Sequence, residues 1–322
     1  MNRFEVVKPN SLAQAKDLVQ EKAWSSYQAG GIDLIDHLKE RLEQPPRIVD
    51  LKGIPNLADI KVEADGALRI GALVKLADVA NDERIKKTHT ALATAVGEAA
   101  SPQIRNVATI GGNVLQRPRC WYYRLEEYKC LKKGGEVCYA VGGENRYHVI
   151  FGGGPSYAVH PSNAAVALVA LGASFVFDGP KGPRTVAASE FFQLPSKNEM
   201  VENSLAPAEI LTAIRVPAAS GRSIYDEVRE RQAFDWPLVS LAASVRVEGG
   251  LVKDCRVVLG AVAPVPWRSN RAEAALMGKP LNDMTLQDAA RAAIVGAAPL
   301  SDNGYKVGLV QTLVRRTLAQ LA

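Results

Sequence analysis

The stretch QAGGIDL (28–34) places a glycine pair between a predicted strand and a predicted helix start, and NVATIGGN (106–113) is a second loop with a glycine pair. Glycine has no Cβ, so the backbone can approach a ligand closely there. The first N–H groups of a helix lack intrahelical partners and can bind a phosphate. One such turn is more often a plain connection. Two of them, the second with Thr109 and Asn113 as polar neighbours, indicate a ligand that contains a diphosphate. Neither has the G-x-G-x-x-G pattern of a Rossmann unit.

The segments around these loops alternate between strand and helix patterns. Apolar spacing and turn residues predict the first five elements between residues 4 and 51. The predicted strands cover 4–9, 25–31, 47–51, 60–65, 67–73, 173–179 and 209–217, and the predicted helices cover 11–21, 32–43, 89–99 and 163–172.

The pattern changes after Pro217, where AASGRS (218–223) reads as a linker. Three alternating strands (224–232, 237–250 and 251–262) are followed by helices near 270–277, 285–297 and 305–321. Strands first and helices afterwards indicate a separate α+β domain. We therefore expect a domain over 1–217, with subdomains of about 1–55 and 56–217, and a second domain over 218–322.

Composition excludes several classes of protein. The apolar fraction of 47% and the charged fraction of 23% are ordinary for a globular chain, and the net charge is +5. No apolar run is long enough for a membrane span, and no basic run or motif indicates nucleic-acid binding. Without a visible export signal, we expect a cytoplasmic protein, or one exported only together with a partner.

Three of the four cysteines, Cys120, Cys130 and Cys138, lie in one glycine-rich loop. Free thiols clustered in this way are an oxidation hazard unless a metal or a cluster holds them as thiolates. Cys255 lies in an apolar strand pattern and is predicted to be a core thiol.

AGGIDL (29–34) and ATIGGN (108–113) resemble the AGGT-x-L and T-I-G-G-N elements of the FAD-binding medium subunits of molybdenum hydroxylases. RIGALVKLADVA (69–80) and LGAVAPVPWRSNRAEAAL (259–276) are similar to two further elements of that family. The resemblance implies an α+β fold, in which a two-part FAD-binding domain of the vanillyl-alcohol oxidase/PCMH type precedes a small α+β domain with a three-stranded antiparallel sheet plus helices.

By the same resemblance, the chain holds FAD and passes electrons from partner subunits to an external acceptor. The implied partners are a molybdopterin-binding large subunit and a [2Fe–2S] small subunit. The implied FAD-binding residues are Ser26, Tyr27, Gln28, Ala29, Gly30, Gly31, Ile32, Asp33, Leu34, Thr109, Gly112, Asn113 and Asn163.

Three positions depart from the family pattern. Ile32 replaces a threonine and so removes a hydroxyl donor. Asn163 stands where relatives often have Asp, and its amide can still accept a hydrogen bond. Glu227 stands where relatives often carry Lys, so no flavin role is carried over to it.

Residues 116–158 resemble the insertion of those members whose flavin subunit carries an extra [4Fe–4S] cluster. The resemblance implies Cys120, Cys130 and Cys138 as ligands, with Ser156 where the related pattern has a fourth cysteine. Alternatives are His148 as the fourth ligand, an incomplete or labile cluster, or a loop that has lost its cluster. We expect four aromatic residues to wall off the loop rather than stack on a flavin, namely Trp121, Tyr122, Tyr123 and Tyr128. We expect Arg124, Lys132 and Lys133 to form a solvated face, with tuning of the cluster potential or docking of a partner as the alternative.

Two other functions compete with the electron-transfer subunit. The first is a flavin-free assembly or binding subunit, which the departures at Ile32, Asn163 and Ser156 favour. The second is a free-standing FAD-dependent dehydrogenase of the vanillyl-alcohol oxidase type, for which no substrate cap domain can be placed. No catalytic side chain is predicted, because a flavin carries its own chemistry.

Overall fold

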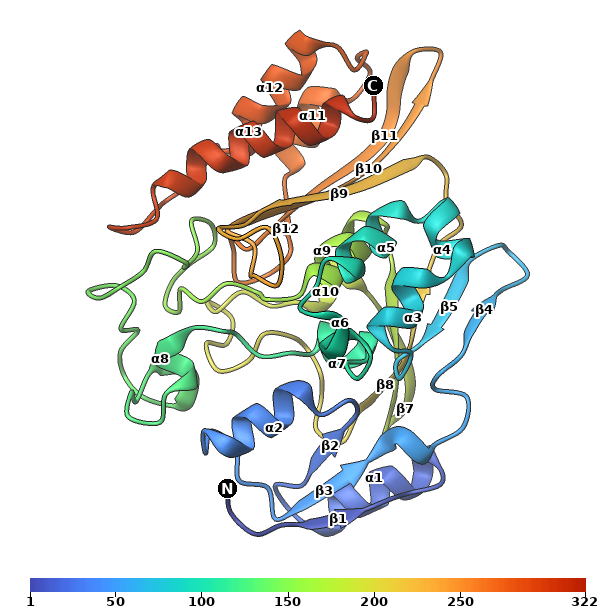
Figure 1. The fold of residues 1–322 in the computed structure, drawn as a ribbon, viewed down its shortest axis with the longest axis vertical. Helices are drawn as coiled ribbons and strands as arrows, with labels where there is room; N and C mark the ends of the chain where they lie inside the picture. Colours follow the sequence, from blue (N-terminus) through green and yellow to red (C-terminus); the bar gives the residue numbers. More distant parts are fainter.

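The computed structural model describes all 322 residues, and its strands form three sheets (Figure 1). The first sheet is parallel, in the order β1-β3-β2. Its elements are β1 (Glu5–Val7), α1 (Leu12–Glu21), β2 (Ser26–Gln28), α2 (Ile32–Lys39) and β3 (Arg47–Asp50). Ser11 caps α1 by accepting from the N–H of Gln14, as the sequence predicts for a helix start.

The second sheet is antiparallel, in the order β4-β5-β8-β6-β7. Its strands are β4 (Ile60–Val62), β5 (Leu68–Gly71), β6 (Ser174–Gly179), β7 (Gly182–Ala187) and β8 (Ile210–Val216). Its helices are α3 (Leu76–Asn81), α4 (Glu83–Thr88), α5 (Thr90–Gly97), α6 (Pro102–Arg105), α7 (Ile110–Val114), α9 (Asn163–Ala170) and α10 (Ala188–Phe191). Every residue of α9 is buried, which explains its uniformly apolar sequence after Asn163.

The C-terminal part contains an antiparallel sheet in the order β12-β11-β10-β9, with helices packed on one face (Figure 1). Its elements are β9 (Arg222–Val228), β10 (Val239–Glu248), β11 (Leu251–Gly260), β12 (Trp267–Arg268), α11 (Asn270–Leu276), α12 (Asp283–Ala293) and α13 (Tyr305–Ala319). The three long strands are those predicted, and the two-residue β12 is an addition. Cys255 is 4% exposed in the core of this part, as predicted.

The insertion 116–158 has little regular structure. It contains α8 (Trp121–Arg124) and a 3-10 turn over Leu131–Lys133. Ile150 and Phe151 join the apolar core of the C-terminal part, and their N–H groups donate to the carbonyl of Val262. The insertion is therefore packed against a distant part of the chain.

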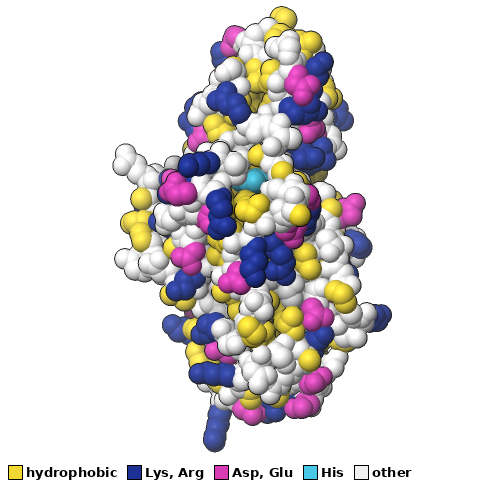
Figure 2. Space-filling model, turned by 90° about the vertical axis from the view of Figure 1, so that its right-hand side faces the viewer, with side chains coloured by type: hydrophobic (Ala, Val, Ile, Leu, Met, Phe, Trp, Pro, Cys, Tyr) yellow, Lys and Arg dark blue, Asp and Glu magenta, His cyan; other side chains and the backbone are white.

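Charged side chains of both signs are interspersed over the face drawn in Figure 2, with apolar side chains between them. None of the helices combines the length and the apolar character needed to cross a bilayer.

Candidate FAD and cysteine sites

A cavity of about 700 Å³ lies between the N-terminal subdomain, α7 and the β9–β10 connection. This volume is in the upper part of the range usual for small-molecule sites. Of the thirteen residues that the resemblance assigns to FAD, all except Gln28 line the cavity. Two segments that are about 75 residues apart in the chain thus line one cavity.

The glycines in these loops allow the chain to approach itself. A Cβ on Gly30 would lie 2.3 Å from the carbonyl oxygen of Val107, and one on Gly111 would lie 2.8 Å from the Cβ of Ala72. Gly31 has φ +79°, a left-handed conformation that favours glycine. The expected reason for Gly30 was close approach to a ligand, whereas the contact that requires it is between the two loops.

The two loops differ in the backbone donors that they leave free. Helix α2 begins with the bond from the Ile35 N–H to the Gly31 carbonyl (2.9 Å), so the three preceding N–H groups have no intrahelical partner. In the second loop, the N–H groups of Ile110 and Gly111 donate to the carbonyls of Val74 and Ala72. Those of Gly112 and Asn113 donate to Thr109. Only the α2 loop can therefore offer a row of N–H groups to a phosphate.

Two asparagines bring side-chain amides to the cavity wall. Asn113, from α7, accepts through Oδ1 from the Ser162 hydroxyl (2.6 Å). Asn163, at the start of α9, donates through Nδ2 to Glu227 Oε2 (3.0 Å). Tyr225 donates to the same carboxylate oxygen (2.6 Å).

The environment of Glu227 contains opposing influences. Burial is the largest effect and raises the pKa of its carboxyl above the usual value, while the Tyr225 hydrogen bond and the nearby guanidinium of Arg229 offset part of that rise. Arg229 Nη1 lies 3.2 Å from Glu227 Oε1. Two of the positions at which the chain departs from its family pattern, Asn163 and Glu227, are thus in direct contact.

An ion-pair network joins α2 to the cysteine insertion. Asp33 Oδ1 lies 2.8 Å from Arg124 Nη2 and 3.0 Å from Arg119 Nη2. Its Oδ2 accepts from the backbone N–H of Arg117 (2.8 Å). Burial alone would raise the pKa of Asp33, but Arg119 and Arg124 outweigh it and hold the pKa below its usual value. The Asp33 carboxylate, which the resemblance assigns to FAD, is therefore engaged by arginines.

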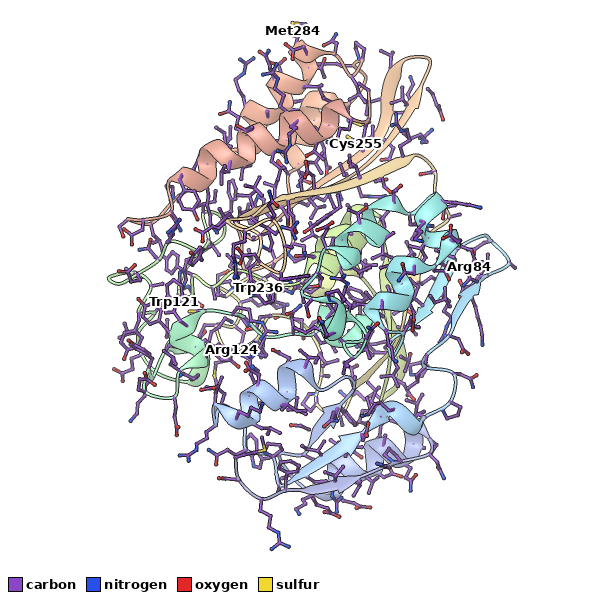
Figure 3. All side chains as sticks on the ribbon, viewed as in Figure 1. Arg84, Trp121, Arg124, Trp236, Cys255 and Met284 are labelled. Atoms are coloured by element: carbon purple, nitrogen blue, oxygen red, sulfur yellow. The ribbon has the colours of Figure 1, made fainter.

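Sequence reasoning missed part of the cavity wall. Arg117 and Arg119 reach it from the insertion, and Phe234 and Trp236 reach it from the β9–β10 connection. The Arg119 guanidinium lies 5.1 Å from the ring centre of Trp236, a cation–π arrangement. Figure 3 shows Trp236 in the central region of the molecule, below the C-terminal sheet. The basic residues around Arg119 are a sequence feature that could have drawn attention to this wall. No spacing rule, however, indicates which part of the chain they contact.

The insertion encloses a second, much smaller cavity, lined by the three cysteines and Ser156. Tyr122 and Tyr123, two of the four aromatic residues expected to wall off the loop, line this cavity together with Tyr139. Ser156 is 4% exposed and Cys130 is 6% exposed. No three ionisable ligands lie close enough together to hold a single metal ion.

His148 contacts this group from outside the cavity lining. Its Nε2 lies 3.3 Å from Cys120 Sγ, and burial lowers its pKa to about 4. Burial also raises the pKa of the Cys120 thiol to about 11, with smaller contributions from Cys130 and Cys138. In this environment the thiol keeps its proton until a metal displaces it.

The expected solvated face of basic residues is wrong for two of its three members. Lys132 is 7% exposed and pairs with the buried Glu202, with Nζ 2.6 Å from Oε1. Arg124 bonds to Asp33 and Asp36 and lies in α8 beside α2 (Figure 3). Carboxylates from distant segments cover these side chains, which local charge patterning does not reveal.

Two family models together match nearly the whole chain. Residues 2–219 match the family described as "FAD binding domain in molybdopterin dehydrogenase", and residues 223–321 match the "CO dehydrogenase flavoprotein C-terminal domain". The chain therefore belongs to the FAD-binding medium subunits of the molybdenum hydroxylase family.

Individual relatives span its full length. The chain is 34% identical to the aldehyde oxidoreductase FAD-binding subunit of Escherichia coli (strain K12), covering 100% of this chain and 98% of that one. It is 30% identical to the carbon monoxide dehydrogenase medium chain of Hydrogenophaga pseudoflava, covering 98% and 96%. A solved structure of carbon monoxide dehydrogenase from that organism matches with a TM-score of 0.79 at 28% identity, covering 99% of this chain and 97% of the other.

Proposed function

We propose that this chain is the electron-transfer subunit of a molybdenum hydroxylase complex, with FAD in the 700 Å³ cavity. The observation that carries the proposal is the convergence of twelve predicted FAD residues on one cavity that includes the N-terminus of α2. Its free N–H groups would hold the diphosphate. FAD accepts electrons from one carrier and donates them to another, and the chain's own residues bind and orient it.

The complex would contain a molybdopterin-binding large subunit and a [2Fe–2S] small subunit. Relatives named as medium chains support this assembly. The sequence has no cysteine pattern for a [2Fe–2S] ferredoxin-type centre, so the substrate-oxidising centres would belong to the partners. The predicted domain boundaries and cytoplasmic location stay predictions.

We further propose that the small cavity in the insertion holds an iron–sulfur cluster. Three thiols and one hydroxyl line it together with aromatic residues, and thiolates are the preferred ligands of such clusters. Ser156 lines the cavity, whereas His148 contacts Cys120 from outside its lining. This arrangement favours Ser156 over His148 at the fourth position.

The flavin spectrum of the purified chain tests the proposal. We expect the visible absorption of oxidised flavin at one FAD per chain, and no oxidation of aldehydes or purines by the chain alone. Colourless protein that cannot be reconstituted with FAD would favour the flavin-free assembly subunit. Substrate turnover by the isolated chain would favour the free-standing dehydrogenase. Co-purification with a molybdenum subunit checks the assembly.

A further inference from the structure

The two asparagines at the cavity wall are held by different kinds of partner. Ser162 donates to Asn113 Oδ1, and its oxygen also accepts from the N–H of Ala165, which caps α9. The carbonyl of the Asn113 amide is thereby engaged. Its Nδ2 makes no hydrogen bond within the chain, so the group that Asn113 leaves for a ligand is a donor.

Asn163 has the opposite arrangement. An ionised carboxylate only accepts hydrogen bonds, so the amide turns its NH2 toward Glu227. Its Oδ1 has no partner within the chain and is left as an acceptor. Tyr225 donates to one oxygen of Glu227, and Arg229 lies against the other. Arg229 is itself paired with Glu98 at 2.9 Å, so the carboxylate has a defined position.

We propose that Ser162 and Glu227 are positioning residues that set the polarity of this wall, so that Asn113 presents a donor and Asn163 an acceptor. Such a pair recognises a ligand edge with a carbonyl next to an N–H group. The pyrimidine ring of a flavin has that imide edge, whereas its dimethylbenzene end has no polar group. The inference rests on the proposed occupation of the cavity by FAD and adds the orientation of the ring, with its imide edge at Asn113 and Asn163.

The test uses the full chain, stripped of flavin and titrated with FAD, with flavin fluorescence as the readout. In Glu227→Lys the new side chain is a donor, so the Asn163 amide reverses and presents its NH2 to the cavity. Losing one ligand hydrogen bond should weaken FAD binding about tenfold. Glu227→Gln keeps a carbonyl acceptor for Asn163 and should bind FAD nearly as the parent does. Adding Asn163→Asp to Glu227→Lys should restore affinity, because a carboxylate presents acceptors whichever way it turns.

A second ligand distinguishes the loss of one hydrogen bond to the imide N–H from a general weakening of the FAD site. 3-Methyl-FAD lacks the imide N–H, so the parent should bind it about tenfold more weakly than FAD. Glu227→Lys should show little difference between the two ligands. A merely structural role for Glu227 would weaken both ligands equally in that variant, and this result would overturn the inference. Thermal unfolding of the flavin-free proteins is measured in parallel.

The outcomes separate failure of the proposed function from failure of the roles assigned to Ser162 and Glu227. If the parent binds no FAD, the proposed function fails, and this inference with it. If the parent binds FAD and Glu227→Lys binds it equally well, only the inference fails. Should Glu227→Lys not fold, Asn113→Asp, which replaces a donor by an acceptor, should weaken FAD binding about tenfold. Unchanged affinity in that variant would also overturn the proposal.

Discussion

Gly30 lies so close to Val107 that a Cβ on the glycine would come within 2.3 Å of the valine carbonyl oxygen. Real Cβ atoms do not approach backbone atoms so closely, so any side chain at position 30 must separate the two loops. The cavity in which we propose that FAD binds is lined by both loops. The close approach of Gly30 to Val107 therefore helps to set the shape of the cavity, although the two segments are far apart in sequence.

Gly30→Val should yield protein with little or no bound flavin, because the α2 loop moves away from residues 106–113. Flavin content per chain, determined from the visible spectrum, measures the effect. Gly142→Ala is the matched control, since a Cβ there meets nothing within 4 Å. Full flavin content in Gly30→Val would show that the loops do not need this contact.

Arg124→Met should destabilise the protein by about 2–3 kcal/mol, because it leaves the mostly buried Asp33 carboxylate with fewer partners. Urea unfolding of the flavin-free protein measures the change. Asp33→Asn and the double variant complete a mutant cycle, and we expect the two single effects not to add. Additive effects would mean that the 2.8 Å contact contributes nothing.

Lys306 predicts a pH dependence of stability. The side chain is 1% exposed and donates to the carbonyls of Tyr147 and Ala261. Burial lowers its pKa to about 7. The unfolded lysine titrates near pH 10.4, so between about pH 7 and pH 10 the unfolded chain binds more protons than the native one. Stability must therefore rise with pH across that window.

The comparison with Lys306→Met isolates this effect, because methionine does not titrate. Relative to that variant, the parent should gain at most about 1.4 kcal/mol per pH unit between pH 7 and pH 10. The lost hydrogen bonds add a difference that does not depend on pH. Urea unfolding at several pH values measures the relative stability, and parallel curves would show that Lys306 is charged in the folded protein throughout.

The sequence predicted elements with local signals and failed where the decisive contacts are long-range. Ser11 and the apolar spacing of residues 12–21 predict α1 correctly, because a capped amphipathic helix is a local feature. Helices α3 and α4 are each six residues long, and the apolar spacing did not reveal them. The helix predicted over 89–99 corresponds to α5 alone. Short helices give too few turns for a period to emerge.

The same distinction holds at the site. The glycine loops were predictable because close backbone approach restricts the residue type. The partner of Asn163 was not, because Glu227 is 64 residues away and no spacing rule pairs them. Arg124 is likewise 91 residues from Asp33. Charge patterning indicates solvent exposure by default, and only the fold shows which charges are paired.

Ser156→Cys should increase the iron content of the protein. Ser156 lines the same cavity as the three cysteines, and its hydroxyl is a harder and weaker ligand for iron than a thiolate. The parent should therefore hold a cluster that survives anaerobic purification and loses iron in air. A fourth thiolate should raise iron towards about four per chain and slow that loss.

Anaerobic iron and acid-labile sulfide analysis before and after exposure to air measures both effects. Cys255→Ala, which removes a thiol from the C-terminal core, should leave the iron content unchanged, whereas Cys130→Ala should abolish it. Absence of iron from both the parent and Ser156→Cys would show that the loop no longer holds a cluster. Four air-stable irons in the parent would show instead that Ser156 or His148 already ligates well, because a weakly held iron would have been released.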